Sequence, residues 1–121
     1  MYFNNCRFGM HGPIEVFSRN AVQALGAGWH HCRNYFHMAC SGPCWWSEDL
    51  FIDQCLSQVL YVKRETERDL LSETRCSPPK DWRSCKDGSK VAFHPFKDGR
   101  QYKECLDNAE GHNSRGALVF K

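Results

Sequence analysis

Two adjacent carboxylates, Glu48 and Asp49, are the residues with the clearest capacity for chemistry, because they open an amphipathic helix behind a pair of tryptophans. Ser47 is placed to cap this helix, and the first turn of a helix favours ionised carboxylates through its N–H groups and its dipole. Apolar residues then recur at helical spacing: Ile52, Cys55, Leu56 and Val59. One helix face is therefore expected to be buried, with the carboxylates at the helix start. Two interpretations follow, a general base and an ordinary acidic helix start.

Cysteine is the second chemically distinctive residue type. The chain has eight cysteines: Cys6, Cys32, Cys40, Cys44, Cys55, Cys76, Cys85 and Cys105. Their even number in a chain of 121 residues favours disulfides formed in an oxidising compartment. Eight cysteines allow 105 pairings, so sequence leaves the connectivity open. We expect Cys76 and Cys85 to brace the proline-containing loop between them, with Trp82 packed there.

A zinc site is the alternative use of the thiols. Thiolates and imidazoles are the preferred zinc ligands, and one stretch of the chain holds four of them: Cys32, His37, Cys40 and Cys44. Their spacing does not reproduce a paired CxxC motif. A small zinc-stabilised interaction domain is therefore one of three functional hypotheses.

Composition narrows the class of protein. Sixteen basic and fourteen acidic residues give a net charge of +2, and the basic residues are dispersed, so no nucleic-acid partner is expected. The hydrophobic content of 41% is ordinary for one globular domain, or part of one. No run reaches membrane-spanning length, and the first residues lack a signal or anchor pattern. We therefore expect either that a targeting segment lies upstream of a truncated chain, or that the cysteines bind metal or stay reduced.

Periodicity and turn residues predict an α/β fold with a short mixed sheet, flanking helices and disulfide-braced loops. In the first half we expect a strand at 14–17, a helix from Ser18 that ends at Gly26, and a cross-linked loop at 26–44. The helix after Ser47 is expected to reach about Val62.

In the second half, the charges of residues 63–69 alternate in sign, which predicts a solvated face or loop. Residues 91–96 are expected to form a strand that carries His94 into the loop at its end. A short helix follows around 102–109, and residues 117–120 are a candidate edge strand.

Three segments, in this order, carry a resemblance to a known family: residues 12–19 (GPIEVFSR), 48–56 (EDLFIDQCL) and 93–96 (FHPF). Over residues 9–97 the chain resembles the C-terminal half of inverting β1,3-glycosyltransferases of the fringe and core-1 β1,3-galactosyltransferase type. The resemblance implies one partial GT-A-like domain spanning residues 1–121. It implies transfer of a hexose from a UDP-sugar donor to a glycan or glycoprotein acceptor with inversion, in the lumen of the Golgi or endoplasmic reticulum.

The resemblance also implies roles for individual residues. Asp49 corresponds to the base, Glu48 to a group that orients the acceptor or the surrounding loop, and His94 to an imidazole ligand of Mn²⁺. Trp45 and Trp46 are expected to stack on a sugar ring or, alternatively, to form a buried wedge. The alternative for His94 is a structural role. Its imidazole would then hydrogen-bond a backbone group, between two phenylalanines of the core.

The chain departs from the family pattern in having no Asp-x-Asp metal motif. It is therefore expected to correspond to the acceptor-side half and to be inactive by itself. The remaining hypothesis is a non-catalytic, disulfide-rich secreted module that binds glycan or protein.

Overall fold

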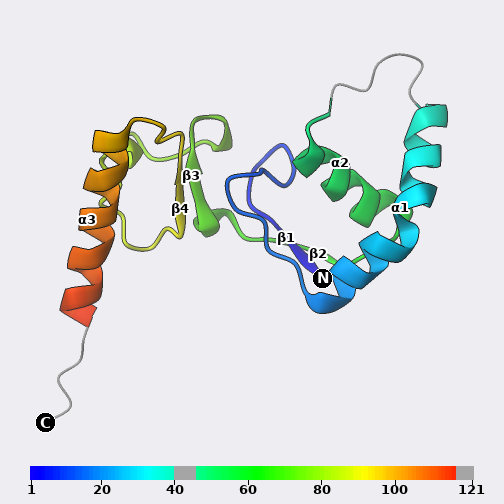
Figure 1. The fold of residues 1–121 in the computed structure, drawn as a ribbon, viewed down its shortest axis with the longest axis horizontal. Helices are drawn as coiled ribbons and strands as arrows, with labels where there is room; N and C mark the ends of the chain where they lie inside the picture. The colour runs from blue at the N-terminus through cyan, green and yellow to red at the C-terminus, as the bar shows by residue number, and fades with distance from the viewer. Residues whose placement is uncertain (40–45, 117–121) are drawn as a thin grey trace, which may run out of the picture. The chain divides into compact units, whose positions relative to one another are not determined.

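The computed structural model describes residues 1–39 and 46–116 (Figure 1). The chain forms two compact units, Met1–Arg68 and Asp69–Lys121, each described here by itself. The helices are α1 (Arg19–Ala39), α2 (Glu48–Gln54) and α3 (Gly99–Gly116), and the strands are β1 (Tyr2–Asn4), β2 (Arg64–Thr66), β3 (Leu71–Glu73) and β4 (Ala92–His94). The predicted α/β class is confirmed. In place of one mixed sheet, the described residues form two separate parallel strand pairs.

In the first unit, β1 pairs in parallel with β2, with Tyr2 opposite Arg64 and Asn4 opposite Thr66. Residues 63–69 were predicted to form a solvated face or loop, and they are a largely solvated face on which residues 64–66 form a strand. The pairing partner lies about sixty residues upstream, and β2 exposes the side chains of Arg64 and Thr66, so its sequence reads as a solvated charged run. A short strand with polar side chains lacks the apolar alternation on which strand prediction depends.

Helix α1 begins where the sequence predicts but continues much further. The Ser18 hydroxyl oxygen accepts a hydrogen bond from the Ala21 N–H at 3.3 Å, which is the expected N-cap. The predicted end at Gly26 was wrong, because α1 runs on to Ala39. Its later turns bury Cys32 and Phe36, and this burial outweighs the helix-breaking tendency of glycine. The predicted loop was thus wrong for residues 26–39, while residues 40–44 lie outside the described residues.

The segments on either side of these elements are less regular than predicted. Residues 14–17 form no strand: Phe17 makes an isolated antiparallel bridge to Tyr2, and the Phe3 N–H donates to the Val16 carbonyl at 3.1 Å. Helix α2 begins at Glu48 as predicted and continues as a π-helical turn over Cys55–Val59. The chain then leaves the helix before the predicted end at Val62.

A buried ionic group joins the parts of the first unit. Asp53 of α2 is fully buried and accepts hydrogen bonds from the Tyr2 hydroxyl at 2.7 Å and the Arg64 guanidinium at 2.9 Å. Gly9 has φ +125°, and a Cβ atom there would lie 2.9 Å from the Asp53 carboxylate. Glycine is thus required at the closest approach of this loop to α2. One carboxylate therefore connects β1, α2 and β2.

The second unit is built on the parallel pair of β3 and β4, with Leu71 opposite Ala92 and Glu73 opposite His94. The predicted strand at 91–96 is thus confirmed over residues 92–94. Trp82 packs edge-on against Phe96, with ring centroids 5.9 Å apart. A cavity of about 310 Å³ remains in this unit, and its apolar lining includes Val91, Phe93, Tyr102 and Leu106.

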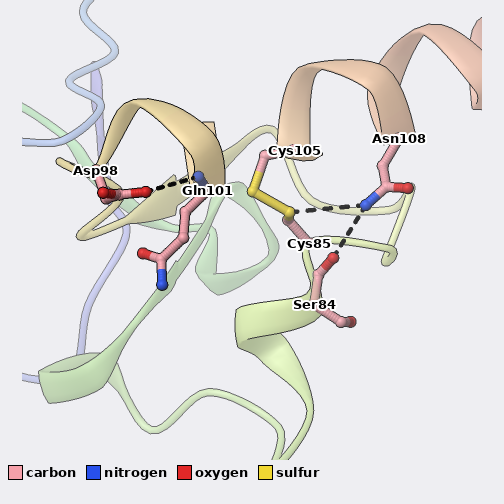
Figure 2. The surroundings of a disulfide bond; sticks show 6 residues. All are labelled: Ser84, Cys85, Asp98, Gln101, Cys105 and Asn108. Atoms are coloured by element: carbon pink, nitrogen blue, oxygen red, sulfur yellow. Dashed lines mark hydrogen bonds between the residues drawn. A yellow bond between two sulfur atoms is a disulfide. The ribbon is translucent and has the colours of Figure 1, made fainter. Parts of the chain in front are cut away.

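Helix α3 confirms the predicted helix around 102–109 and extends it in both directions. A disulfide joins Cys105 of α3 to Cys85 (Figure 2), so the two cysteines expected to brace the loop, Cys76 and Cys85, are not bonded to each other. Asn108 donates to the Ser84 carbonyl at 3.1 Å beside this bond. The predicted edge strand at 117–120 lies outside the described residues.

The disulfide expectation holds throughout the described ranges. Cys32 is bonded to Cys55, and all six described cysteines are disulfide-bonded: Cys6, Cys32, Cys55, Cys76, Cys85 and Cys105. The predicted zinc site was wrong in its use of Cys32, because a disulfide leaves no thiolate for a metal. Cys40 and Cys44 lie outside the described residues. Among the described helices, none combines the length and apolar character needed to cross a membrane.

Candidate functional site

Asp49 lies at the start of α2 in a nearly closed polar environment, with 6% of the residue exposed. The Gly12 N–H donates to its Oδ2 at 2.8 Å, and the Leu50 N–H donates to its Oδ1 at 2.7 Å. The Ser47 hydroxyl also donates to Oδ1. Two of the segments named in the sequence, 12–19 and 48–56, therefore meet at this carboxylate.

The surroundings of Asp49 keep it ionised. Burial by itself would raise its pKa, but hydrogen bonds from Ser47, Leu50 and Gly12, together with His11, outweigh burial and lower the pKa below its usual value. The His11 Nδ1 atom is 3.4 Å from Asp49 Oδ2. His11 was not singled out in the sequence, because nothing in its spacing linked it to a helix start 38 residues later.

Glu48, next to Asp49, is exposed, and a third carboxylate lies near both. Burial raises the pKa of Glu15, and the charges of Glu48 and Asp49 raise it further. The pKa values of Glu15 and Asp49 are thus displaced in opposite directions, an arrangement that separates proton-donor from proton-acceptor roles in acid–base sites. Sequence reasoning missed Glu15 because it treated residues 14–17 as a structural strand.

The tryptophan predicted to contact sugar belongs to an aromatic cluster between α1 and α2. Trp46 packs edge-on against Phe36 at 4.9 Å, Phe36 packs against Phe51 at 5.6 Å, and Phe51 packs against Trp29 at 5.1 Å. Phe36 is buried, whereas Trp29 and Trp46 are each 38% exposed. Trp46 is therefore not the fully buried wedge of one prediction, and its stacking on a sugar ring stays a prediction. Trp45 lies outside the described residues.

His94 lies in the second unit, at the end of β4, and faces a carboxylate that sequence reasoning missed. Its Nδ1 atom is 3.7 Å from Oε1 of Glu73, which is only 5% exposed. The other oxygen of Glu73 accepts a hydrogen bond from the Arg75 N–H at 2.6 Å. An imidazole and a carboxylate are suitable donors for Mn²⁺ in kind, so these residues fit the implied metal. Only the strand register, invisible in the sequence, brings the two side chains together.

Comparisons with known proteins add no support to the resemblance to glycosyltransferases, which depends on the three sequence segments alone. No protein-family model matches the chain, and neither the curated proteins nor the solved structures include a significant match.

Proposed function

We propose that this chain is a glycosyltransferase-like domain that binds the acceptor for an inverting hexose transfer from a UDP-sugar. The observation that supports this proposal is the ionised carboxylate of Asp49, mounted at the start of α2 and contacted by the Gly12 N–H at 2.8 Å. The disulfides favour an oxidising compartment, which supports the secretory lumen as the location.

In the proposed reaction, Asp49 accepts the proton of the acceptor hydroxyl while the hydroxyl oxygen attacks the anomeric carbon. The new glycosidic C–O bond forms as the C–O bond to the nucleoside diphosphate breaks, and the proton passes from Asp49 to solvent. Glu48, exposed beside Asp49, orients the acceptor by accepting from its other hydroxyl groups. Trp46 stacks on the apolar face of the sugar ring. The resemblance implies that His94, in the second unit, would hold a Mn²⁺ ion, and such an ion supplies positive charge to a nucleoside diphosphate.

The test combines glycan binding with sugar transfer. Binding of the chain to an array of glycans identifies the acceptor, and transfer from candidate UDP-sugars with Mn²⁺ is then measured in a protein that joins this chain to the donor-binding half that the resemblance implies. The Asp49→Asn variant should retain glycan binding and lose about 10²- to 10⁴-fold in transfer rate. Asp107→Asn, which changes an exposed carboxylate on α3, serves as the matched control and should transfer normally. Unchanged transfer by Asp49→Asn would exclude Asp49 as the base.

A second candidate function is a non-catalytic, disulfide-stabilised module that binds glycan. The observation that favours it is the occupation of both Asp49 oxygens by hydrogen bonds, with only 8% of the side chain exposed. An acceptor hydroxyl must displace one of these donors before it can reach the carboxylate. Glycan binding that is insensitive to chelator and weakened by Trp46→Ala, with no transfer under any donor, would establish this second function.

A further inference from the structure

We propose that the disulfide between Cys85 and Cys105 is a reversible thiol–disulfide exchange site, and that its reduction releases α3 within the second unit. This proposal concerns residues that the proposed sugar transfer does not use, and it is tested independently of that function.

The bonds Cys32–Cys55 and Cys85–Cys105 differ in their access to solvent. Cys32 and Cys55 are both 0% exposed and lie within an apolar cluster. Cys85 is 5% exposed, but Cys105 is partly exposed, and both line the cavity of about 310 Å³ in the second unit. Exchange requires an attacking thiolate to reach one of the two sulfur atoms. Cys105 is therefore the accessible end of its bond, whereas Cys32–Cys55 is shielded at both ends.

The sulfur at the other end of this bond has a hydrogen-bond donor beside it. Figure 2 shows the Asn108 amide nitrogen, which donates to the Ser84 carbonyl at 3.1 Å and to Cys85 Sγ at 3.8 Å. A hydrogen bond to the charged form of a group stabilises that form. When a thiolate attacks Cys105, the Cys85 sulfur is the leaving group, and a stabilised leaving thiolate speeds exchange. Asn108 is thus placed to assist cleavage of the bond.

The backbone of Cys85 favours cleavage as well. Cys85 has φ +45° and ψ 32°, in the left-handed region, directly after the turn Trp82–Ser84. Residues other than glycine seldom adopt this conformation, because their Cβ atom crowds the backbone. The bond to Cys105 helps to hold Cys85 in place, so cleavage allows the backbone to relax. Strained or exposed disulfides are in general the ones that are readily reduced.

The co-reactant is a dithiol reductant of the thioredoxin type. Its thiolate attacks the Cys105 sulfur, the S–S bond breaks, and the electron pair goes to the Cys85 sulfur, which leaves a mixed disulfide on Cys105. The second thiol of the reductant then attacks the reductant's own sulfur in this mixed disulfide. The reductant becomes a disulfide and Cys105 leaves as a thiolate that takes up a proton. Two electrons and two protons have then passed from the reductant to the chain.

The expected consequence of reduction is the release of α3. Tyr102 and Leu106, two apolar side chains of α3, are 61% and 47% exposed and line the same cavity as the disulfide. Their contact with solvent means that their burial contributes little to holding the helix in place. The covalent bond is therefore the principal restraint on α3 in this region.

The experiment follows the reduction of each bond in the intact folded chain. The chain is incubated with reduced thioredoxin, samples are quenched with N-ethylmaleimide at intervals, and mass spectrometry of peptides gives the labelled fraction of each cysteine. Cys85 and Cys105 should be labelled at least about tenfold faster than Cys32 and Cys55. Hydrogen exchange on the same samples should show that α3 loses amide protection as its bond is reduced, while α1 keeps it. Glutathione disulfide should restore both the bond and the protection.

Variants separate the assistance by Asn108 from a merely structural role. Asn108→Leu keeps the approximate size of the side chain but removes the N–H donor, and it should slow the labelling of Cys85 and Cys105 by about 2- to 10-fold. Gln101→Leu makes the same amide-to-apolar change at an exposed position of α3 and should leave the rate unchanged. Asn108→Asp places a negative charge beside the sulfur and should also slow the reaction, which provides a second test if the leucine disturbs α3.

Three results would overturn the proposal. Equal labelling rates for the two bonds would contradict a selective exchange site. Unchanged or faster labelling in both Asn108 variants would contradict assistance to the leaving group, because the loss of a structural hydrogen bond loosens α3 and speeds reduction. Full protection of α3 after its bond has been reduced would contradict the release of the helix.

Discussion

The two units of this chain are stabilised in different ways. The first unit buries two adjoining sets of side chains: Tyr2, Met10, Ala21 and Leu56, and then Cys32, Phe36, Cys55 and Val59. In the second unit the buried apolar side chains among the described residues are Leu71, Trp82 and Cys85. Helix α3 leaves Tyr102 61% exposed and Leu106 47% exposed.

A disulfide bond is consequently expected to contribute differently to the stability of each unit. Cys32–Cys55 lies inside an apolar cluster that also holds α1 against α2. Cys85–Cys105 joins α3 to the residue that follows the turn Trp82–Ser84, with the Asn108 hydrogen bond beside it. We infer that packing stabilises the first unit and that a cross-link holds α3 in the second.

The largest effect is expected from Asp53→Ala, which removes the buried partner of Arg64 in the first unit. Removing one member of a buried ion pair costs about 3–5 kcal/mol. Because the Arg64 side chain is 35% exposed, the lower end of this range is expected. Chemical denaturation under non-reducing conditions would measure the loss, with Tyr2→Phe as a smaller control of about 1 kcal/mol. A loss below 1 kcal/mol for Asp53→Ala would contradict a first unit organised around this carboxylate.

The next effect is expected from the double substitution Cys85→Ser and Cys105→Ser. A loop of this length contributes about 3 kcal/mol of stability when closed by a disulfide. Because the apolar side chains Tyr102 and Leu106 of α3 are largely exposed, amides of α3 should lose their protection in hydrogen-exchange measurements, while those of α1 remain protected. The matched Cys32→Ser and Cys55→Ser variant should lower stability yet keep α1 helical. Equal loss of amide protection in α1 and α3 would contradict the inference that packing stabilises the first unit and that a disulfide holds α3 in the second.

A smaller effect concerns pH and belongs to the first unit alone. The lowered pKa of Asp49 means that the folded state favours the ionised carboxylate. Its contribution is therefore present above the unfolded pKa of about 3.9 and lost as pH falls through the lower folded value. Asp49→Asn should cost about 1–3 kcal/mol near neutral pH and flatten the acid side of the stability profile.

Glu15→Gln is the control of opposite sign, and its effect is the smallest. Because the pKa of Glu15 is raised, folding favours its protonated form, and the ionised form lowers stability as pH rises through the folded pKa. The variant should therefore be slightly more stable near pH 7, as followed by thermal unfolding at several pH values. If both variants changed the pH profile in the same direction, the assignment of opposite pKa shifts would be wrong.

Sequence was informative wherever structure depends on neighbouring residues. Ser18 and Ser47 marked the starts of α1 and α2 because the residues that define a helix start lie within a few positions of each other. The predicted helix end at Gly26 was wrong because it, too, was based on neighbouring residues alone. Its local tendency ends a helix, but the burial of Cys32 and Phe36 against Cys55 comes from another part of the chain.

In the candidate sites, too, local features could be predicted from the sequence and long-range contacts could not. Glu48 and Asp49 were recognisable because they share a helix turn. The contacts that define Asp49 come from Gly12 and His11, 37 and 38 residues away. Glu73 was missed because only the register of β3 and β4 places it opposite His94. Disulfide pairing is a further long-range property, which explains why Cys105 was not recognised as the partner of Cys85.

The pairing of β1 with β2 also constrains the order in which the chain can fold. Residues 2–4 find their partners only at residues 64–66, whereas Cys32 and Cys55 are separated by 23 residues. Closing the longer loop costs more entropy and slows folding. During synthesis, β1 must wait until residue 66 has left the ribosome. Helix α1 is therefore expected to form and pack against the region around Cys55 before the first strand finds its partner.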